Sequence, residues 1–150
     1  MSPRILVLNG PNLNLLGERE PEVYGERSWD DIEEELRREA AEMGLELECR
    51  QSNHEGILVD WVQEARSGYA GLIINPGALT HYGYSLHDAL RTLDMPVVEV
   101  HLSNIGAREA WRRESVISPV VTGMIAGFGG LSYRLALAAL RGMIPRKDPS

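Results

Sequence analysis

The chain alternates short apolar segments with amphipathic ones along its length, and this alternation restricts the folds that are open to it. Apolar runs of strand length are followed by polar or turn-forming residues, as at Asn9-Gly10-Pro11. Strands are predicted at residues 4–9, 45–51, 71–75, 97–101 and 120–126. Helices are predicted at 29–43, 57–66, 84–93, 108–113 and 131–143, the first of them capped by Ser28 with Asp31 as its capping-box partner. Five strands separated by helices predict a parallel, doubly wound α/β sheet with right-handed crossovers.

The second predicted strand differs from the others because its residues alternate in polarity. Leu45, Leu47 and Cys49 share one side, and charged residues occupy the other. A half-polar strand belongs at the edge of a sheet, which favours the flavodoxin-like order 2-1-3-4-5 over the Rossmann order. We therefore expect a single flavodoxin-like domain over residues 1–150, with a frayed tail from about residue 145.

This strand order predicts where a ligand would bind. In a doubly wound sheet, ligands bind beyond the carboxyl ends of the strands at the point where the strand order reverses, here between strands 1 and 3. The loops that leave these two strands begin Asn9-Gly-Pro-Asn12 and Asn75-Pro-Gly-Ala78. Two polar, turn-rich loops thus fall at the predicted site.

Residues 9–25 form a connection that is long and polar for a compact domain, with Arg19 five positions before Tyr24. Loops of this kind are usually lids or binding loops. A cation near a phenol lowers the pKa of the phenol, so Arg19 could turn Tyr24 into a usable base. Gly17 and Gly25 bracket the pair and could act as hinges.

The fourth predicted strand carries a carboxylate and an imidazole on one face. Glu99 and His101 are two residues apart, so strand alternation places both on the side opposite Val100. A carboxylate in this position can orient the His101 ring or raise its basicity. The alternative is a pair of polar residues at a strand exit, but the position at the carboxyl edge favours catalysis.

The residues after this strand could bind an anion. Leu102 and Ser103 offer backbone N–H groups, and Arg108 and Arg112 are spaced for one helical face. An arginine pair of this spacing also occurs on solvated helix faces. Asn75 and His81 bracket the turn after strand 3, and each could equally be a turn or surface residue.

Composition excludes several classes of function. The net charge of −7 argues against a nucleic-acid-binding protein, and no apolar run is long enough to span a membrane, so we expect a cytoplasmic protein. Lys147, in the tail, is the only lysine, which argues against Schiff-base chemistry. The single cysteine, Cys49, excludes an internal disulfide, and His54-Glu55 lacks the second histidine of a zinc motif. We expect neither a metal nor a cofactor.

Four separated motifs resemble one known family. They are Leu8 to Gly17 (LNGPNLNLLG), Arg19 with Tyr24-Gly25, Asn75-Pro-Gly-Ala78 with Thr80-His81, and Glu99 to Ile105 (EVHLSNI). Over nearly the whole chain, the sequence resembles the type II 3-dehydroquinate dehydratases of the shikimate pathway, which leads to chorismate and the aromatic amino acids. The resemblance implies reversible loss of water from 3-dehydroquinate to give 3-dehydroshikimate, with no metal and no Schiff base.

The resemblance also implies a catalytic role for five residues. Tyr24 would be the phenolate base that removes the C2 proton, and Arg19 would lower its pKa. A water held near Asn12 would stabilise the resulting enolate. His101, with Glu99 behind it, would protonate the departing C1 hydroxyl.

Substrate binding and assembly follow from the same resemblance. The amides of Leu102 and Ser103 would hold the substrate carboxylate, and the hydroxyls would bind Asn75, His81 and Arg112. Asp88 would approach the site from a neighbouring subunit of a homo-oligomer, a dodecamer built from trimers. His87 stands where the family often has an arginine beside this aspartate.

A flavodoxin-like binding or receiver module without catalysis is the alternative. A flavin-binding protein would need a phosphate-cradling first loop, and a receiver would need acidic residues after strand 1. The sequence has Asn-Gly-Pro-Asn in that place, so we favour the dehydratase.

Overall fold

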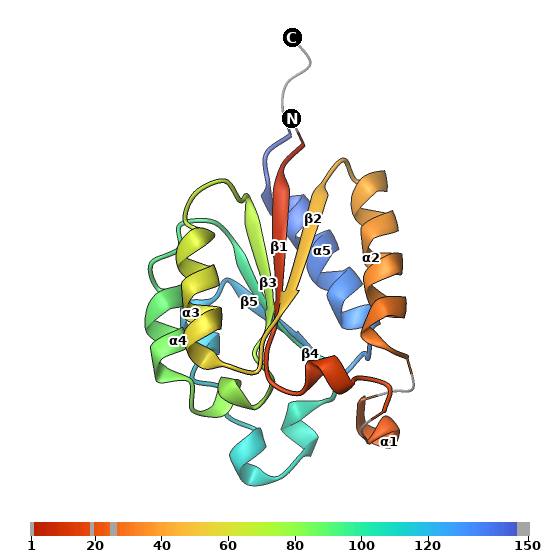
Figure 1. The fold of residues 1–150 in the computed structure, drawn as a ribbon, viewed down its shortest axis with the longest axis vertical. Helices are drawn as coiled ribbons and strands as arrows, with labels where there is room; N and C mark the ends of the chain where they lie inside the picture. The colour runs from red at the N-terminus through yellow and green to blue at the C-terminus, as the bar shows by residue number, and fades with distance from the viewer. Residues whose placement is uncertain (1, 19, 25–26, 147–150) are drawn as a thin grey trace.

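The computed structural model describes residues 2–18, 20–24 and 27–146 of the chain, without the side chains of Pro21 and Tyr24. Its centre is one parallel sheet with the strand order β2-β1-β3-β4-β5 (Figure 1). The strands are β1 (Arg4–Asn9), β2 (Glu46–Gln51), β3 (Gly71–Asn75), β4 (Val97–His101) and β5 (Gly123–Ala126). The α/β class and the order 2-1-3-4-5 predicted from the sequence are confirmed.

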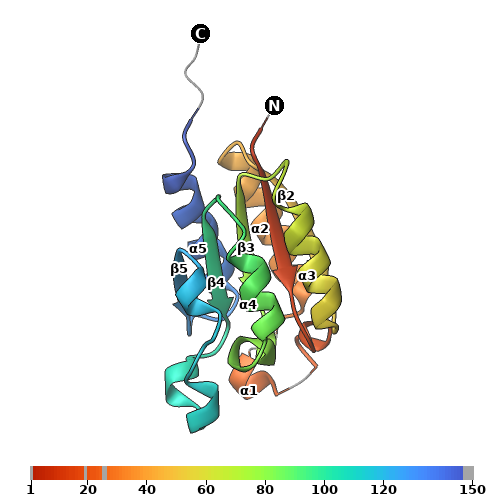
Figure 2. The same ribbon diagram turned by 90° about the vertical axis from the view of Figure 1, so that its left-hand side faces the viewer.

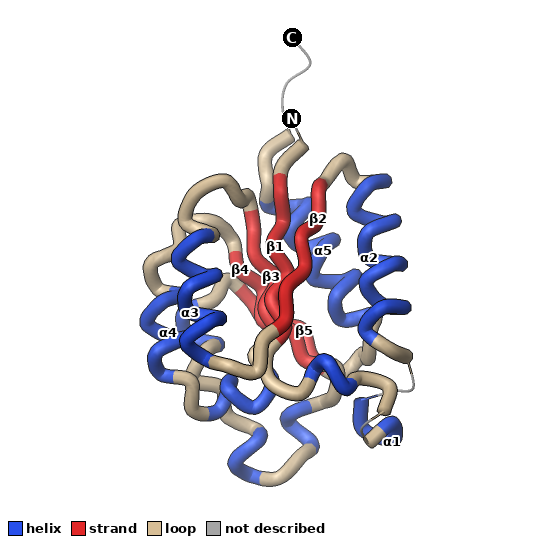
Figure 3. Tube along the Cα trace, viewed as in Figure 1, coloured by secondary structure: helices blue, strands red, loops and turns tan. Residues whose placement is uncertain are grey.

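Helices cover both faces of the sheet (Figure 1, Figure 3). The five α-helices are α1 (Pro21–Tyr24), α2 (Trp29–Glu42), α3 (Glu55–Glu64), α4 (Tyr84–Leu90) and α5 (Leu131–Met143). α2 and α5 lie on one face, and α3 and α4 lie on the other, which the view from the side also shows (Figure 2). None of the helices in the described ranges is both long and apolar enough to cross a bilayer.

The two-sided covering explains why the central strands are continuously apolar. In β1, Ile5 and Val7 belong to the core beneath α2 and α5, whereas Leu6 and Leu8 belong to the core beneath α3 and α4. All four side chains are fully buried. A strand that is buried on both faces has no polar side, unlike β2, whose residues are mostly half-buried at the edge.

Most boundaries agree with the sequence prediction, and the differences have local causes. Ser28 caps α2 as predicted, because its hydroxyl accepts a hydrogen bond from the Asp31 N–H (3.3 Å). The fifth strand begins at Gly123 instead of residue 120, because Ser118–Val120 forms a 3₁₀ turn that contains Pro119. The helix predicted at 108–113 was wrong: a 3₁₀ turn at Ile105–Ala107 ends just before this stretch, and only Ala110–Arg112 within it forms a second short 3₁₀ turn.

The helices on the second face are displaced by a few residues from their predicted ends. α3 begins at Glu55, two residues before the predicted start, and α4 ends at Leu90, three residues before the predicted end. Such shifts are normal, because helix ends fray and their hydrogen bonds change to 3₁₀ geometry.

The connection after β1 has more regular structure than predicted. Leu13–Leu15 forms a 3₁₀ turn, and Pro21–Tyr24 forms the single turn of α1. Leu13 and Leu16 are buried and join the core beneath α2. The first half of this long, polar connection is therefore packed onto the domain.

A buried tyrosine links the ends of the two central strands. The Tyr133 hydroxyl donates to Asn9 Oδ1 (2.7 Å) and accepts a hydrogen bond from Asn75 Nδ2 (2.9 Å). Asn9 and Asn75 are the paired last residues of β1 and β3. Burial raises the pKa of the Tyr133 phenol, so the hydroxyl stays neutral and can donate.

This bridge predicts a specific loss of stability. Tyr133→Phe would remove the hydroxyl partner of two buried atoms, Asn9 Oδ1 and Asn75 Nδ2, and we expect the free energy of unfolding to fall by about 1–3 kcal/mol. Urea denaturation at neutral pH would measure this as a lower midpoint. Tyr82→Phe is the control, because the Tyr82 ring is 54% exposed, and an equal midpoint for the two variants would contradict the prediction.

Candidate active site

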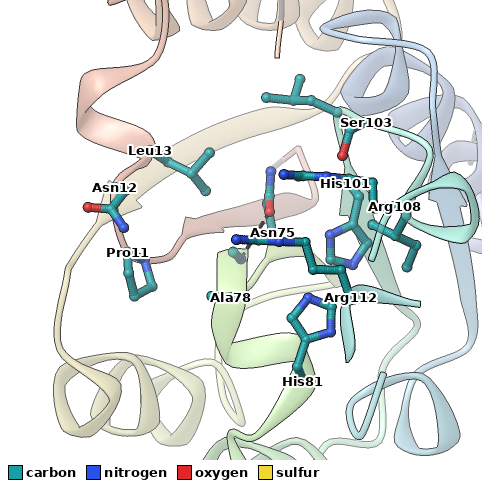
Figure 4. Close-up of a pocket in the computed structure, with 13 residues that line it drawn as sticks. Pro11, Asn12, Leu13, Asn75, Ala78, His81, His101, Ser103, Arg108 and Arg112 are labelled. Atoms are coloured by element: carbon teal, nitrogen blue, oxygen red, sulfur yellow. Dashed lines mark hydrogen bonds between the residues drawn. The ribbon is translucent and has the colours of Figure 1, made fainter. Parts of the chain in front are cut away.

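Three loops at the carboxyl edge of the sheet enclose a cavity of about 210 Å³ (Figure 4). The loop after β1 contributes Pro11, Asn12 and Leu13, and β3 with its following turn contributes Asn75, Gly77, Ala78 and His81. The end of β4 and the residues that follow contribute His101, Leu102, Ser103, Ile105, Arg108 and Arg112. The cavity therefore lies at the switch point between β1 and β3, as the strand order predicts.

Glycines allow the loops after β1 and β3 to touch. The Gly10 N–H donates to the Asn75 carbonyl (2.8 Å), and a Cβ atom on Gly10 would lie 2.5 Å from the Pro76 carbonyl oxygen. Gly77 has a φ of 60°, and its Cβ position would be 3.0 Å from the Pro11 carbonyl oxygen. Larger residues at these two positions would push the loops apart.

Glu99 and His101 are in direct contact, as strand alternation predicts. His101 Nε2 lies 2.5 Å from Glu99 Oε2, and both side chains are buried. Burial alone would raise the pKa of the Glu99 carboxyl, but the hydrogen bond and charge of His101, followed by hydrogen bonds from Thr80 and Ser118, bring that pKa below its usual value. Glu99 is therefore ionised, and its charge stabilises a protonated imidazole.

Sequence reasoning missed the hydroxyl groups around Glu99. Thr80, Ser115 and Ser118 all donate to its carboxylate. They come from two loops far apart in the sequence and follow no periodic pattern. The available signal was the position of Glu99 on a buried strand, since a buried carboxylate requires several donors.

The side chain of Asn75 is partly committed to the fold. Its Nδ2 donates to the Tyr133 hydroxyl, and its Oδ1 accepts from the Gly77 N–H (3.1 Å). An amide nitrogen carries two hydrogens, so Asn75 retains one to offer to a molecule in the cavity. Asn75 can thus serve both the fold and a ligand.

The segment after β4 brings positive charge to the cavity. Figure 4 shows the Arg108 and Arg112 side chains extending from one wall towards Asn75. The guanidinium of Arg112 stacks on the Trp111 ring (4.0 Å to the ring centre) and forms an ion pair with Glu109 (2.5 Å). The described lining includes two arginines and two histidines but no Asp or Glu. Although the chain has a net charge of −7, this lining favours an anionic ligand.

His81 is held at the lower wall in Figure 4 by two contacts. Its Nδ1 lies 2.6 Å from the Glu114 carbonyl oxygen, and its ring meets the Trp111 ring edge-on at 5.2 Å. Leu102 and Ser103 follow β4 directly and line the cavity beside His101. All three residues lie at the cavity, as the sequence prediction requires.

Asn12 lies on the wall opposite Ser103 and Arg108 (Figure 4). Its main chain is left-handed, with a φ of 70°, a conformation that asparagine tolerates better than most residues. Its N–H donates to Asn53 Oδ1 (3.0 Å), so the loop after β2 fixes this turn.

The structure does not test the predicted positions of Arg19 and the Tyr24 side chain, and it places Asp88 outside the cavity lining. Arg19 lies outside the described residues, and so does the side chain of Tyr24, whose main chain ends α1. The proposed pairing of these two residues therefore stays a prediction. Asp88 lies on α4, where its exposed carboxylate contacts His87 Nδ1 (3.0 Å), and it does not line the cavity of its own chain.

No group of three His, Cys, Asp or Glu side chains in the described ranges is arranged to hold a metal ion. Cys49 packs against the core beneath α2, and burial raises the pKa of its thiol to about 12. This cysteine is thus neutral and does not line the cavity.

Comparisons with known proteins agree with the geometry of this site. Residues 3–141 match the family model for class II dehydroquinase. A 3-dehydroquinate dehydratase of Agrobacterium fabrum is 54% identical over 94% of this chain and 97% of its own length. The crystal structure of a type II dehydroquinase from Propionibacterium acnes superposes with a TM-score of 0.91 at 46% identity, covering 95% of this chain and 98% of its own. The type II dehydroquinase from Butyrivibrio crossotus gives the same TM-score at 43% identity, covering 93% and 97%. The chain belongs to the class II dehydroquinase family.

Proposed function

We propose that this dehydroquinase removes water reversibly from 3-dehydroquinate, giving 3-dehydroshikimate, in the cavity at the carboxyl edge of the sheet. Family membership and the names of the relatives support the dehydration itself. The observation that supports this location is the buried Glu99–His101 pair, which opens onto a lining with two arginines and no described acidic residue. The substrate is an anion, and its reaction requires proton transfer. The non-catalytic alternative is therefore not favoured.

His101 is the proposed general acid. Glu99 holds Nε2 of the ring and, being ionised, stabilises the protonated form. The other ring nitrogen would then donate its proton to the C1 hydroxyl as the C1–O bond breaks, so that the hydroxyl leaves as water. The ring acts from a fixed position because both members of the pair are buried.

The base and the enolate are assigned to the opposite side of the cavity. Tyr24, as phenolate, would remove the C2 proton, and Arg19 would favour the phenolate form. The electron pair from the C–H bond moves onto the ketone oxygen, and a water near Asn12 would stabilise this enolate. The enolate then collapses to the C1–C2 double bond as the hydroxyl departs. α1, which ends at Tyr24, lies at the same end of the sheet as the cavity loops (Figures 1 and 2).

Substrate binding is assigned to the remaining lining residues. The main-chain amides of Leu102 and Ser103 would hold the carboxylate, with Arg108 and Arg112 adding positive charge nearby. Asn75, with its second Nδ2 hydrogen, would bind a hydroxyl together with His81 and Arg112. No metal, Schiff base or cofactor takes part in this scheme.

The proposed assembly is a dodecamer built from trimers, in the cytoplasm. Asp88 supports an oligomer in which subunits complete one another's sites, because its carboxylate is exposed and lies away from its own cavity. In this arrangement Asp88 would contact the substrate region of a neighbouring subunit.

Loss of the acid or the base should nearly abolish turnover. His101→Ala and Tyr24→Phe each remove a proton-transfer group, so we expect kcat to fall by about 10²–10⁴-fold. The rise in ultraviolet absorbance of the conjugated enone measures the rate when purified protein is given 3-dehydroquinate. His54→Ala is the matched control, because His54 precedes α3 and does not line the cavity. Full activity in either test variant would remove that residue from its role, and an inactive wild-type protein would refute the dehydratase.

Mixing two inactive variants tests the role of Asp88 across subunits. Asp88→Ala keeps His101, and His101→Ala keeps Asp88, so a cyclic trimer that contains both can form intact sites. Random mixing in such a trimer makes about one site in four intact. We therefore expect co-expressed variants to recover about a quarter of wild-type activity, and no recovery in mixed trimers verified by mass spectrometry would place Asp88 within its own site.

The mass of the particle tests the assembly independently of activity. Twelve chains of 16.7 kDa would give a particle of about 200 kDa. Sedimentation equilibrium measures this mass directly, and a monomer or dimer at micromolar concentration would contradict the proposed dodecamer.

A further inference from the structure

The Glu99 carboxylate lies in a shell of three hydroxyl groups. Thr80 and Ser115 (3.0 Å) donate to Oε2, which also contacts His101. Ser118 donates to Oε1 (2.7 Å), where Ser115 makes a second, longer contact (3.2 Å). The side chain of Glu99 has no exposed surface. Its two oxygens therefore receive from protein groups the hydrogen bonds that water would otherwise supply.

The chemistry of these donors matters as much as their number. Hydroxyl groups solvate a carboxylate without cancelling its charge, whereas a lysine or arginine would neutralise it. Within the described ranges, His101 is the only basic side chain that forms an ion pair with Glu99. Among the described side chains, the negative charge of Glu99 is thus paired with the imidazole of His101 alone.

The hydrogen bonds of Ser115 fix the direction in which its hydroxyl donates. Ser115 Oγ accepts from the N–H groups of Ile117 (3.1 Å) and Ser118 (2.9 Å). A hydroxyl has two acceptor positions and one hydrogen. Since both acceptor positions are occupied, Thr80 donates its own hydrogen to Glu99, and Ser115 directs its hydrogen towards Thr80 and Glu99. The polarity of the cluster is therefore set by the main chain.

The neighbours of Ser115 in the chain hold residues 114–118 against the turn after β3. The Val116 N–H donates to the Thr80 carbonyl (2.7 Å), and the Glu114 carbonyl contacts His81 Nδ1. Ile117 is fully buried in the core beneath α3 and α4. Residues 114–118 thus tie the arginine-bearing wall to the turn after β3 and, through Ser115 and Ser118, to Glu99.

We propose that Ser115 and Ser118, together with Thr80, are positioning residues that hold the Glu99 carboxylate in the orientation in which it binds His101. The inference rests on the proposed role of His101 as general acid. The hydroxyls never touch the substrate and act only through Glu99. The position of the arginine-bearing wall and the orientation of His101 are thereby linked, because Ser115 and Ser118 directly follow that wall in the chain and contact Glu99.

Ser118 gives the cleanest test, because its hydroxyl makes the shorter bond to Oε1 and its side chain is half-buried. In Ser118→Ala we expect kcat to fall about 10-fold, with KM within about twofold of wild type, because the acid is misaligned while the binding groups remain. Ser118→Thr keeps a hydroxyl and should restore most of the rate. Thr122→Val is the matched control. It removes a hydroxyl that accepts from the Val97 N–H (2.9 Å) at the start of β4, the strand that carries Glu99, and should leave kcat unchanged.

A pH profile separates positioning from a merely structural role. The groups that face Glu99 are His101 from β4, Thr80 from the turn after β3, and Ser115 and Ser118 from residues 114–118; Met124 from β5 lies next to Ser118. Ser118 is one of the groups that lower the pKa of Glu99. Its removal should move the acid limb of the kcat profile to higher pH, and Thr122→Val should not. An unchanged acid limb in Ser118→Ala would overturn the proposal.

A double-mutant cycle tests whether Ser118 acts on catalysis through Glu99. Glu99→Gln removes the charge that the hydroxyls hold, so Ser118→Ala should lower kcat further by less than twofold in that background. A full additional 10-fold loss would show that Ser118 acts independently of Glu99 and would overturn the proposal. An inactive wild-type protein would instead refute the dehydratase, so the two failures are distinguishable.

Acid unfolding provides a readout without substrate. A carboxylate with a lowered pKa contributes stability that is present above its unfolded pKa and is lost as the pH falls through its folded pKa. In Ser118→Ala the folded pKa rises towards the unfolded one, so this loss should be smaller and should be complete at a higher pH than in wild type, and Glu99→Gln should lack this component. Urea midpoints measured from about pH 6 to pH 3 record the change. Identical pH dependence in wild type and Ser118→Ala would contradict the assigned contact.

Discussion

A buried negative charge organises the catalytic end of this protein. Removing a carboxylate from water is costly unless donors replace its hydration. Glu99 obtains these donors only when the turn after β3 and residues 114–118 both fold against β4, bringing Thr80, Ser115 and Ser118 to it. The arrangement of the cavity walls and the orientation of His101 therefore both depend on the charge of Glu99. Substitutions of the surrounding hydroxyl residues should affect catalysis through this carboxylate.

The sheet supplies the frame on which this charge is placed. Parallel strands bring their carboxyl ends to one edge, and the order reversal between β1 and β3 leaves room there. Tyr133 holds Asn9 and Asn75 together beneath the cavity, and Gly10 allows the main chain of the first loop to touch that of the second. Core packing and cavity shape are thus linked by a few polar contacts, so the core side chain of Tyr133 also helps to set the position of Asn75.

Sequence periodicity predicted the regular secondary structure and the side chains that share one face of a strand. The apolar runs predicted the central strands, the half-polar strand predicted at 45–51 indicated the order, and alternation placed Glu99 beside His101. The hydroxyls around Glu99 could not be predicted in this way, since Thr80 and Ser118 meet only after folding and neither lies in a periodic segment. The same limitation affected the turn at 118–120 and the packed turn at 13–15, where single contacts and Pro119 override the local pattern.

The charges of the site have an order that suits an acid acting on an anion. Arg108 and Arg112 lie at the cavity, His101 forms its inner wall, and Glu99 lies behind the ring, away from the lining. An acidic group in the cavity itself would repel the substrate carboxylate, and a lysine or arginine beside Glu99 would weaken its hold on the imidazolium. Hiding the carboxylate behind the ring and solvating it with hydroxyls avoids both effects. Glu99 thus keeps its charge behind the ring while the cavity stays attractive to an anion.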